Sequence, residues 1–201
     1  MTGNFTIESD FSGFTKVFLE ENSKHNLISH NDEQFLYEKH IYDSLAIKLF
    51  FEKHGNNFKN VLDIGCGGGF PCVPIAIEYP QLKVTGIDSI RKKIHCIENI
   101  KNSLGITNLT LICERVENIK NQKFNLIVSR AVGDLSKLID YAYPLMADNG
   151  YFIAYKSKKA DDEIQKADLK LKKLNLKLND IIEYSISTNQ VYERKLICIK
   201  K

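Results

Sequence analysis

The stretch that most constrains the fold is residues 61–74, VLDIGCGGGFPCVP, where an apolar run leads directly into four glycines within five residues. The apolar run is typical of a buried strand. Glycine has no Cβ and reaches backbone angles that other residues avoid, so the glycines are typical of a loop that lies close to a ligand. We therefore expect a strand, a tight turn against a nucleotide-like ligand, and then a helix.

Strand and helix patterns alternate from residue 60 onward. Alternation of this kind builds a parallel sheet with helices on both faces. No helix separates the last two strand patterns, so we expect an antiparallel last strand in a Rossmann-like α/β sheet of seven strands. Strands are predicted at 60–64, 83–88, 109–113, 124–129, 150–155, 181–187 and 194–199, and helices at 73–79, 91–104, 134–143 and 161–174.

Two amphipathic helices are predicted ahead of the sheet, from Asp10 to Asn26 and from about Asp32 to the stop at Gly55. We expect residues 1–58 to form an N-terminal helical extension and residues 59–201 to form the Rossmann-like domain. His40 and Asp43 lie three positions apart in the second helix, close enough to face the same way. On pattern alone, such a pair is more typical of surface or filler positions.

Composition limits the location of the protein and the chemistry available to it. The chain has 201 residues, enough for one full core, and no apolar run approaches the roughly 18 to 20 residues that span a bilayer. The N-terminus lacks the pattern of a signal peptide, so a cytoplasmic location and no membrane partner are expected. The five cysteines form no CxxC pair and have no histidine-rich spacing, so neither a disulfide framework nor a metal site is expected.

The charge is uneven although the net charge is only +3. Residues 1–58 carry 5 basic and 9 acidic side chains, and residues 59–201 carry 23 basic and 16 acidic ones. A basic second part is compatible with a nucleic-acid substrate, because phosphates attract lysine and arginine. A lysine-rich solvated surface is the plainer interpretation of the same numbers.

The glycine loop excludes two common nucleotide sites. A dinucleotide loop needs glycine at position 70, where Phe70 stands, and a triphosphate loop needs a Gly-Lys-Ser/Thr ending that is absent. The pattern is instead Gly65-x-Gly67-x-Gly69. Asp88 ends the second strand, 23 residues after Gly65, where a carboxylate can accept hydrogen bonds from both ribose hydroxyls. This combination favours S-adenosylmethionine, an adenosine ligand without a pyrophosphate.

A specific resemblance emerges from the same segments. The chain resembles the RsmG (GidB) family of bacterial methyltransferases, which form 7-methylguanosine in small-subunit (16S) ribosomal RNA. The resemblance covers about residues 26–158 and implies the class I S-adenosylmethionine-dependent methyltransferase fold. It is carried by VLDIGCGGGFPCVPIAI, VTGIDSIRKKIHCIENIKNSLGITNLTLICERVEN, FNLIVSRAV, NLISHNDEQFLYEKHIYDSL and AYKSK.

The resemblance also implies site residues. Asp88 matches the ribose carboxylate of the family. Arg130, in the SRA motif at the end of the fourth strand, is expected where cofactor and acceptor meet. Lys156 and His40 are further candidates for contact with RNA phosphate or the target base, and the basic trio 91–93 is a weaker one. The positions that match the family's cofactor contacts are Gly65, Phe70, Val116, Glu117 and Arg130.

Departures from the family pattern and from other methyltransferase motifs inform the mechanism. Cys66 and Cys72 stand where the family often has Ser or Thr and usually has Gly, and packing explains them better than a thiol nucleophile does. The NPPY or DPPY motif of amino-methyltransferases is absent. Guanine N7 already carries an in-plane lone pair, so orientation and electrostatics would suffice and no general base is expected.

The predicted partners are 16S ribosomal RNA and the small ribosomal subunit, with no DNA substrate and a monomeric enzyme. Two alternatives stay open at this point. One is a methyltransferase of the same fold that acts on a small molecule or a protein, and the other is a non-catalytic module that binds S-adenosylmethionine or RNA.

Overall fold

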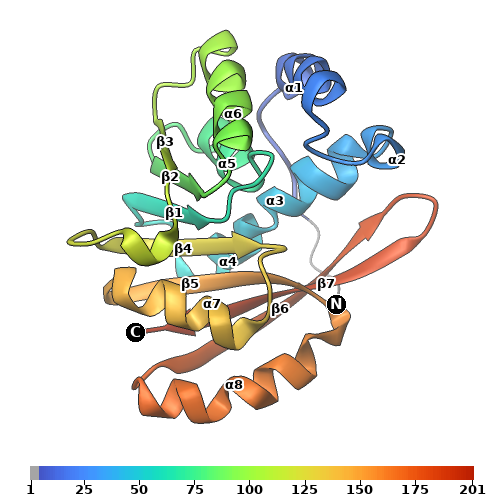
Figure 1. Ribbon diagram of the computed structural model, residues 1–201. Coiled ribbons are helices and arrows are strands. Elements are labelled where there is room, and N and C mark those ends of the chain that lie inside the picture. Colours follow the sequence, from blue (N-terminus) through green and yellow to red (C-terminus); the bar gives the residue numbers. More distant parts are fainter. Residues whose placement is uncertain (1–4) are drawn as a thin grey trace.

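The computed structural model describes residues 5–201, apart from the side chain of Lys159. Seven strands form one sheet in the order β3-β2-β1-β4-β5-β7-β6 (Figure 1). Their bounds are β1 Asn60–Ile64, β2 Lys83–Asp88, β3 Leu109–Cys113, β4 Phe124–Arg130, β5 Met146–Ser157, β6 Lys177–Ser187 and β7 Val191–Lys200.

The first five strands pair in parallel, and β7 lies between β5 and β6 and runs antiparallel to both. The predicted seven-stranded sheet with an antiparallel last strand is therefore confirmed. β5 begins four residues earlier than predicted, because Met146 already pairs with Phe124 ahead of an irregularity in the register. β6 and β7 also exceed the predicted lengths, and their hairpin projects beyond the rest of the sheet (Figure 1).

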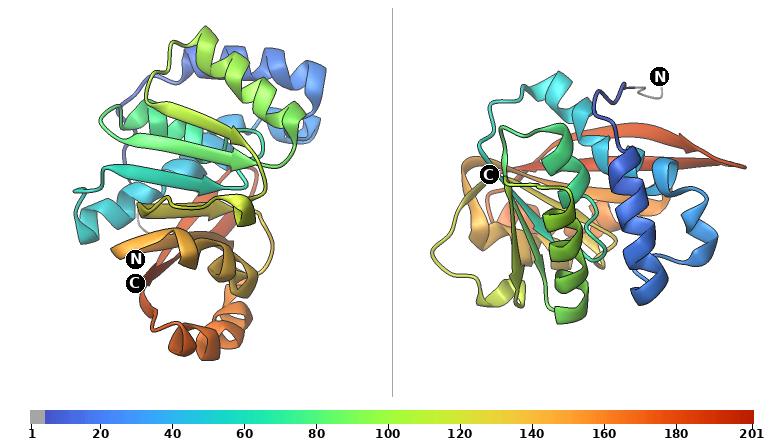
Figure 2. Two further views of the ribbon diagram at one scale, coloured as in Figure 1. Left: turned by 60° about the vertical axis from the view of Figure 1, so that its left-hand side comes forward. Right: turned by 90° about the horizontal axis from the view of Figure 1, so that it is seen from above.

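Helices cover both faces of the sheet (Figure 2). The apolar residues of β1 show the division, since Val61 belongs to the cluster on one face and Leu62 to the cluster on the other. The first cluster includes α1 Ser12–His25, α4 Ile47–His54, α5 Cys72–Glu78 and α6 Arg91–Ser103. The second includes α7 Leu135–Ala142 and α8 Asp161–Lys173. No helix within residues 5–201 has both the length and the hydropathy to cross a bilayer.

The second predicted helix is not continuous, and this part of the prediction was wrong. It is divided into α2 His30–Glu33, a π-helix at Tyr37–Tyr42, α3 Asp43–Leu45 and α4. Within the π-helix, the Lys39 carbonyl accepts a hydrogen bond from the Arg130 side chain at 3.0 Å. In α3, which follows it, the Ser44 carbonyl accepts one from the Tyr155 hydroxyl at 2.7 Å. Because π-turns inside helices often mark functional sites, this segment is a candidate part of one.

The N-terminal helices share a core with the sheet. Phe14 and Phe18 of α1, and Phe50 of α4, belong to the same buried cluster as residues of β1 and β4. Figures 1 and 2 show α1 lying beside α6. The N-terminal helices that precede the predicted boundary at residue 58 thus pack continuously against the sheet that follows it.

Candidate active site

The carboxyl ends of the parallel strands form one edge of the sheet, and the strand order reverses there between β1 and β4. In open α/β sheets this switch point is where ligands bind. A cavity of about 530 Å³ lies at this edge, a volume within the usual range for small-molecule sites. Its wall includes Ile64 and Gly65 at the end of β1, Asp88 at the end of β2, Glu114 after β3 and Arg130 at the end of β4.

The glycine loop forms one wall of this first cavity. Gly65 and Gly67 have positive φ angles, 73° and 55°, which favour glycine. A Cβ on Gly65 would lie 2.4 Å from a methyl carbon of Val132, so no larger residue fits without movement of that side chain. Glycine therefore suits position 65, because the loop that contains Val132 comes too close to the backbone there for a side chain.

Asp88 is held in place by the loop itself. Its Oδ2 accepts a hydrogen bond from the Gly67 N–H at 2.9 Å, and its Oδ1 accepts one from the Ile90 N–H at 2.9 Å. Each carboxylate oxygen has a second lone pair, so both can still accept from a pair of vicinal hydroxyls. On the opposite wall, Val116 and Glu117 belong to the short 3-10 helix Val116–Asn118 that follows β3. These residues fit an adenosine-containing cofactor.

The connection between α1 and α2 closes the cavity from the N-terminal side. Leu27 and Ile28 line it, and a Cβ added to Gly68 would meet the Leu27 Cβ at 3.3 Å. Phe70 also lines the cavity and is otherwise buried, with its ring 5.0 Å from that of Phe18 in α1. The contribution of Leu27 and Ile28 was not predicted, because nothing in their local sequence marks them as ligand-facing.

Arg130 is the centre of a buried polar network. Its Nη1 donates to Asp43 Oδ2 at 2.8 Å, and its guanidinium group lies 5.2 Å above the ring of Phe70. Asp43 Oδ1 in turn accepts a hydrogen bond from the hydroxyl of Tyr184 at 2.6 Å. Next in the chain, Ala131 has a φ of 60°, an unusual angle for a residue with a side chain that is found at strained functional sites.

His40 lies against the same guanidinium group. Arg130 Nη2 is 3.0 Å from His40 Nδ1. Because arginine can only donate, Nδ1 must be the acceptor and the proton of the neutral ring is on Nε2. Burial and the charge of Arg130 lower the pKa of His40 to about 4. The Nε2 atom is buried and finds no hydrogen-bond partner in the part of the chain that the structure describes.

A second cavity of about 550 Å³ adjoins the first. His40, Arg130 and Ala131 line both cavities, so they form the wall that the two share. Four basic side chains surround the second cavity: Lys39, Arg130, Lys156 and Arg194. Lys156 Nζ donates to the Gly133 carbonyl at 2.6 Å and pairs with Glu163 at 2.7 Å, so it belongs to the second cavity and not to the first.

The predicted residues therefore divide into four groups, according to whether they line neither cavity, both cavities, the second only or the first only. Gly69 is buried behind the loop, where a Cβ would lie 2.8 Å from Val73, and it shapes the entry to α5 without lining a cavity. His40 and Arg130 lie between the cavities, and Lys156 lies in the second. The predicted residues that line only the first cavity are Gly65, Gly67, Phe70, Asp88, Val116 and Glu117, with Lys93 from the basic trio.

Two cysteines and an aspartate lie beneath the loop. Cys66 and Cys72 are buried, and burial raises the pKa of the Cys72 thiol well above its ordinary range. An uncharged buried thiol is a poor nucleophile, which agrees with a packing role. Asp63 Oδ2 accepts from the Cys72 N–H at 3.0 Å, and burial raises the pKa of Asp63 to about 7. Asp63 thus supports the start of α5.

Solved structures with the same fold define the class of this protein. The chain superimposes on magnesium protoporphyrin IX methyltransferase from Synechocystis, solved with bound SAM, with a TM-score of 0.66 and 17% identity over 96% of this chain and 100% of that one. It also superimposes on TYW2 of M. jannaschii, solved with AdoMet, with a TM-score of 0.60 and 17% identity over 79% of this chain and 76% of that one. The fold is that of the class I S-adenosylmethionine-dependent methyltransferases.

Sequence comparison then gives the family. The profile of the GidB family, described as rRNA small subunit methyltransferase G, matches residues 7–193. Two relatives carry the name ribosomal RNA small subunit methyltransferase G. The protein of Staphylococcus epidermidis is 32% identical over 98% of this chain and 82% of its own length, and that of Thermoanaerobacter sp. is 34% identical over 95% and 80%. The chain belongs to this family, and the resemblance found in its sequence is confirmed.

Proposed function

We propose that the protein transfers the methyl group of S-adenosylmethionine to N7 of one guanine in 16S ribosomal RNA of the small subunit, acting as a monomer in the cytoplasm. The observation that carries this proposal is the pair of adjoining cavities that share Arg130 and His40. The first is built from a glycine loop and a fixed carboxylate, as an adenosine cofactor requires. The second is lined by basic side chains, as an RNA acceptor requires.

The first cavity would hold the cofactor through residues of four strand ends. Asp88 would accept hydrogen bonds from the ribose hydroxyls, and the backbone of Gly65 and Gly67 would lie against the amino-acid part. Val116 and Glu117 would contact the adenine edge, and Phe70 would supply an apolar wall. S-adenosylmethionine, when bound, supplies a methyl group on a positively charged sulfur.

The shared wall would place the acceptor base. His40 lines both cavities, so its ring would lie beside the target base. A low pKa keeps His40 neutral, and Asp43 at 2.8 Å balances the charge of Arg130. The wall therefore adds little repulsion when the methylated base gains positive charge. Lys156, Lys39 and Arg194 would contact the RNA backbone around that base.

Incubation with radiolabelled S-adenosylmethionine tests the proposal. Small ribosomal subunits, naked 16S RNA, DNA, proteins and metabolites are offered separately, and labelled RNA is cleaved chemically at 7-methylguanosine. We expect label in one guanine of the small-subunit RNA and in none of the other substrates. Label in a protein or a metabolite, or bound cofactor without any transfer, would replace the proposal with one of the alternatives.

The variant Arg130→Lys tests the wall that the two cavities share. Lysine keeps the charge but loses the planar group that contacts Asp43, His40 and Phe70 at once. We expect methyl transfer to fall on the order of 100-fold, a free-energy difference of about 2.7 kcal/mol. A full rate of transfer in this variant would show that Arg130 does not position either reactant.

A further inference from the structure

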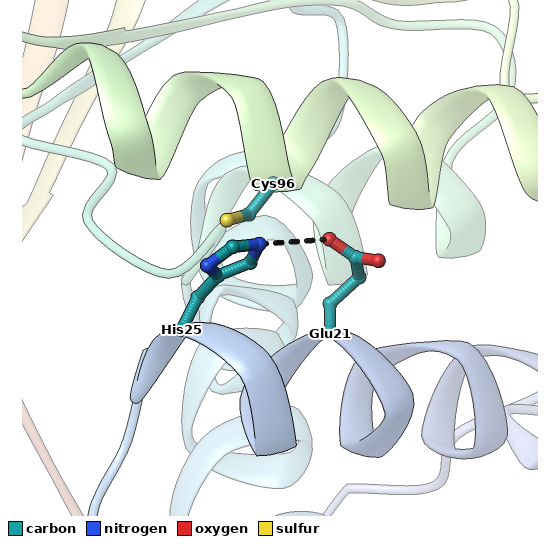
Figure 3. Close-up of side chains that lie close together, drawn as sticks. All are labelled: Glu21, His25 and Cys96. Carbon is teal, nitrogen blue, oxygen red and sulfur yellow. Dashed lines mark ion pairs between the residues drawn. The ribbon is translucent and has the colours of Figure 1, made fainter.

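A cluster of possible metal ligands lies at the contact between α1 and α6, outside both cavities. Glu21 and His25 lie four positions apart on one face of α1, and Cys96 faces them from α6. One ligand atom from each of the three lies within 4.8 Å of the other two. Figure 3 shows the sulfur of Cys96 and the carboxylate of Glu21 both directed toward the imidazole ring of His25.

Two of the three groups are buried, and the partly exposed histidine is incompletely paired. Cys96 is fully buried and Glu21 is 7% exposed. The Nδ1 atom of His25 is buried and has no hydrogen-bond partner in residues 5–201. Its Nε2 lies 4.0 Å from Glu21 Oε2, which is beyond hydrogen-bond distance. Neither ring nitrogen of His25 makes a hydrogen bond within the described residues, so the ring can offer one of them to a cation.

The carboxylate is already oriented by outer partners. Asn99 Nδ2 donates to Glu21 Oε2 at 3.1 Å, and Lys24 Nζ donates to Oε1 at 3.0 Å. Burial acts to raise the pKa of Glu21, but these two hydrogen bonds outweigh it and the pKa lies below its ordinary value. Hydrogen bonds of this kind orient the ligands in natural metal sites. The side chain of Lys24 is 59% exposed, so it can turn into solvent when another cation takes its place.

We propose that Glu21, His25 and Cys96 bind a zinc-class divalent cation that fastens α1 to α6. A thiolate, an imidazole and a carboxylate together suit Zn²⁺ and not Mg²⁺ or Ca²⁺, which take oxygen ligands. Around zinc the ligand atoms stand roughly 3.5 Å apart, so side-chain rotation must bring the three groups about 1 Å closer. On binding, the Cys96 thiol loses its proton to solvent as the sulfur–metal bond forms, and water completes the fourth position.

A cation at this position would act on the N-terminal wall of the first cavity. The chain that follows α1 supplies Leu27 and Ile28 to the first cavity, and Phe18 of α1 contacts Phe70. Fastening the end of α1 would therefore stabilise the N-terminal wall of the first cavity. This inference does not depend on the identity of the methyl acceptor, because metal binding is measured without any substrate.

The test uses the full-length protein after treatment with a chelator. Zn²⁺ affinity is measured by competition with a chromogenic chelator, and Co²⁺ serves as a spectroscopic probe of thiolate ligation. We expect one equivalent of Zn²⁺ to bind, a thiolate-to-cobalt charge-transfer band, and a rise in the thermal unfolding midpoint. A protein that binds no stoichiometric Zn²⁺, or that binds Co²⁺ without a thiolate band, would overturn the proposal.

Variants locate the site. Cys96→Ala and His25→Gln should each weaken Zn²⁺ binding at least tenfold and abolish the rise in the unfolding midpoint. The matched controls are Cys113→Ala and His30→Gln, which change exposed residues of the same types and should bind as the original protein does. Because His25 is partly exposed, its variant keeps the test valid if the buried Cys96 variant fails to fold. Loss of binding in a control but not in His25→Gln would place the metal elsewhere.

Discussion

The two cavities on either side of Arg130 are similar in volume but are built in different ways. The first is walled mainly by the loops that follow β1 to β4, and its glycine loop lets backbone form the surface. The second is walled by side chains from the π-helix segment, the end of β4, the end of β5 and the first residues of β7. A ligand of the first cavity meets backbone groups and a fixed carboxylate, whereas a ligand of the second meets four basic side chains and the two aspartates that pair with Lys39 and Arg130.

This difference indicates which of the two cavities single substitutions can alter. The walls of the first cavity consist largely of backbone at glycines and strand ends, so their shape is kept as long as the glycine loop folds. Walls made of side chains depend on each residue separately, and single substitutions can adjust them. We therefore expect cofactor binding to be governed by sterics at a few glycines, and RNA binding to be spread over several cations. Four predictions test this contrast, in order of decreasing effect.

The largest effect is expected at the buried end of the second cavity. Asp43→Ala removes the partner of Arg130 and Tyr184 and leaves a buried charge unpaired, so the free energy of unfolding should fall by about 3–5 kcal/mol. The control is Asp32→Ala in the same cavity, whose ion pair with Lys39 is partly exposed and should contribute less than about 1 kcal/mol. Urea unfolding of both variants measures the two losses. Equal losses would contradict the buried network.

The next effect concerns Asp63, beneath the first cavity. Its pKa is about 7 in the folded protein and near 3.8 when the chain is unfolded. Between these values the folded state holds a proton that the unfolded state releases, so this group's stabilisation is present below about pH 4 and is lost as the pH rises to 7. The change amounts to at most about 4 kcal/mol.

Asp63→Asn removes this titration while keeping an oxygen that can accept from the Cys72 N–H. The stability of the variant relative to the original protein should therefore increase as the pH rises from 4 to 7. Urea unfolding at several pH values measures this difference. A difference that stays constant over that range would show that the carboxyl group is ionised throughout.

The third effect separates sterics from backbone strain in the first cavity. Gly65→Ala places a Cβ at 2.4 Å from Val132, and cofactor affinity should fall on the order of 100-fold, or about 2.7 kcal/mol. Gly55→Ala is the control, because Gly55 also has a positive φ, 82°, but a Cβ there meets nothing within 4 Å. Calorimetric titration with the cofactor compares them. Similar losses in both would assign the effect to strain alone.

The smallest effect concerns a single cation of the second cavity. Lys39→Gln should weaken RNA binding about tenfold at moderate salt and reduce the slope of log affinity against log salt by about 1. Lys172→Gln serves as its control, because Lys172 also pairs with an aspartate, at 2.6 Å, but lies on α8 away from both cavities. Filter binding over a salt series provides the measurement, and an unchanged slope for Lys39→Gln would remove this residue from the RNA contact.

The first cavity was largely predictable from sequence, and the second was not. The β1 loop and Asp88 follow from local rules, since glycine pattern and strand end lie within one strand-loop-helix-strand unit. Lys39 and Arg194 could not be placed, because they are 155 positions apart and meet only through the order of strands in the sheet. The π-turn was missed for a related reason: one of its carbonyls is bound by Arg130, 91 positions further along the chain. Periodicity within a helix contains no information about such a partner.

The hydrogen bond between Asp43 and Tyr184 joins residues that are 141 positions apart. A ribosome that adds roughly 5–20 residues per second needs about 7–30 s to proceed from one to the other. During that interval the nascent chain already contains the glycine loop and Asp88 but lacks one side of the Arg130 network. The protein can therefore complete the wall that the two cavities share only after Tyr184 has been synthesised, and a chain released before β6 would carry the glycine loop beside an unfinished second cavity.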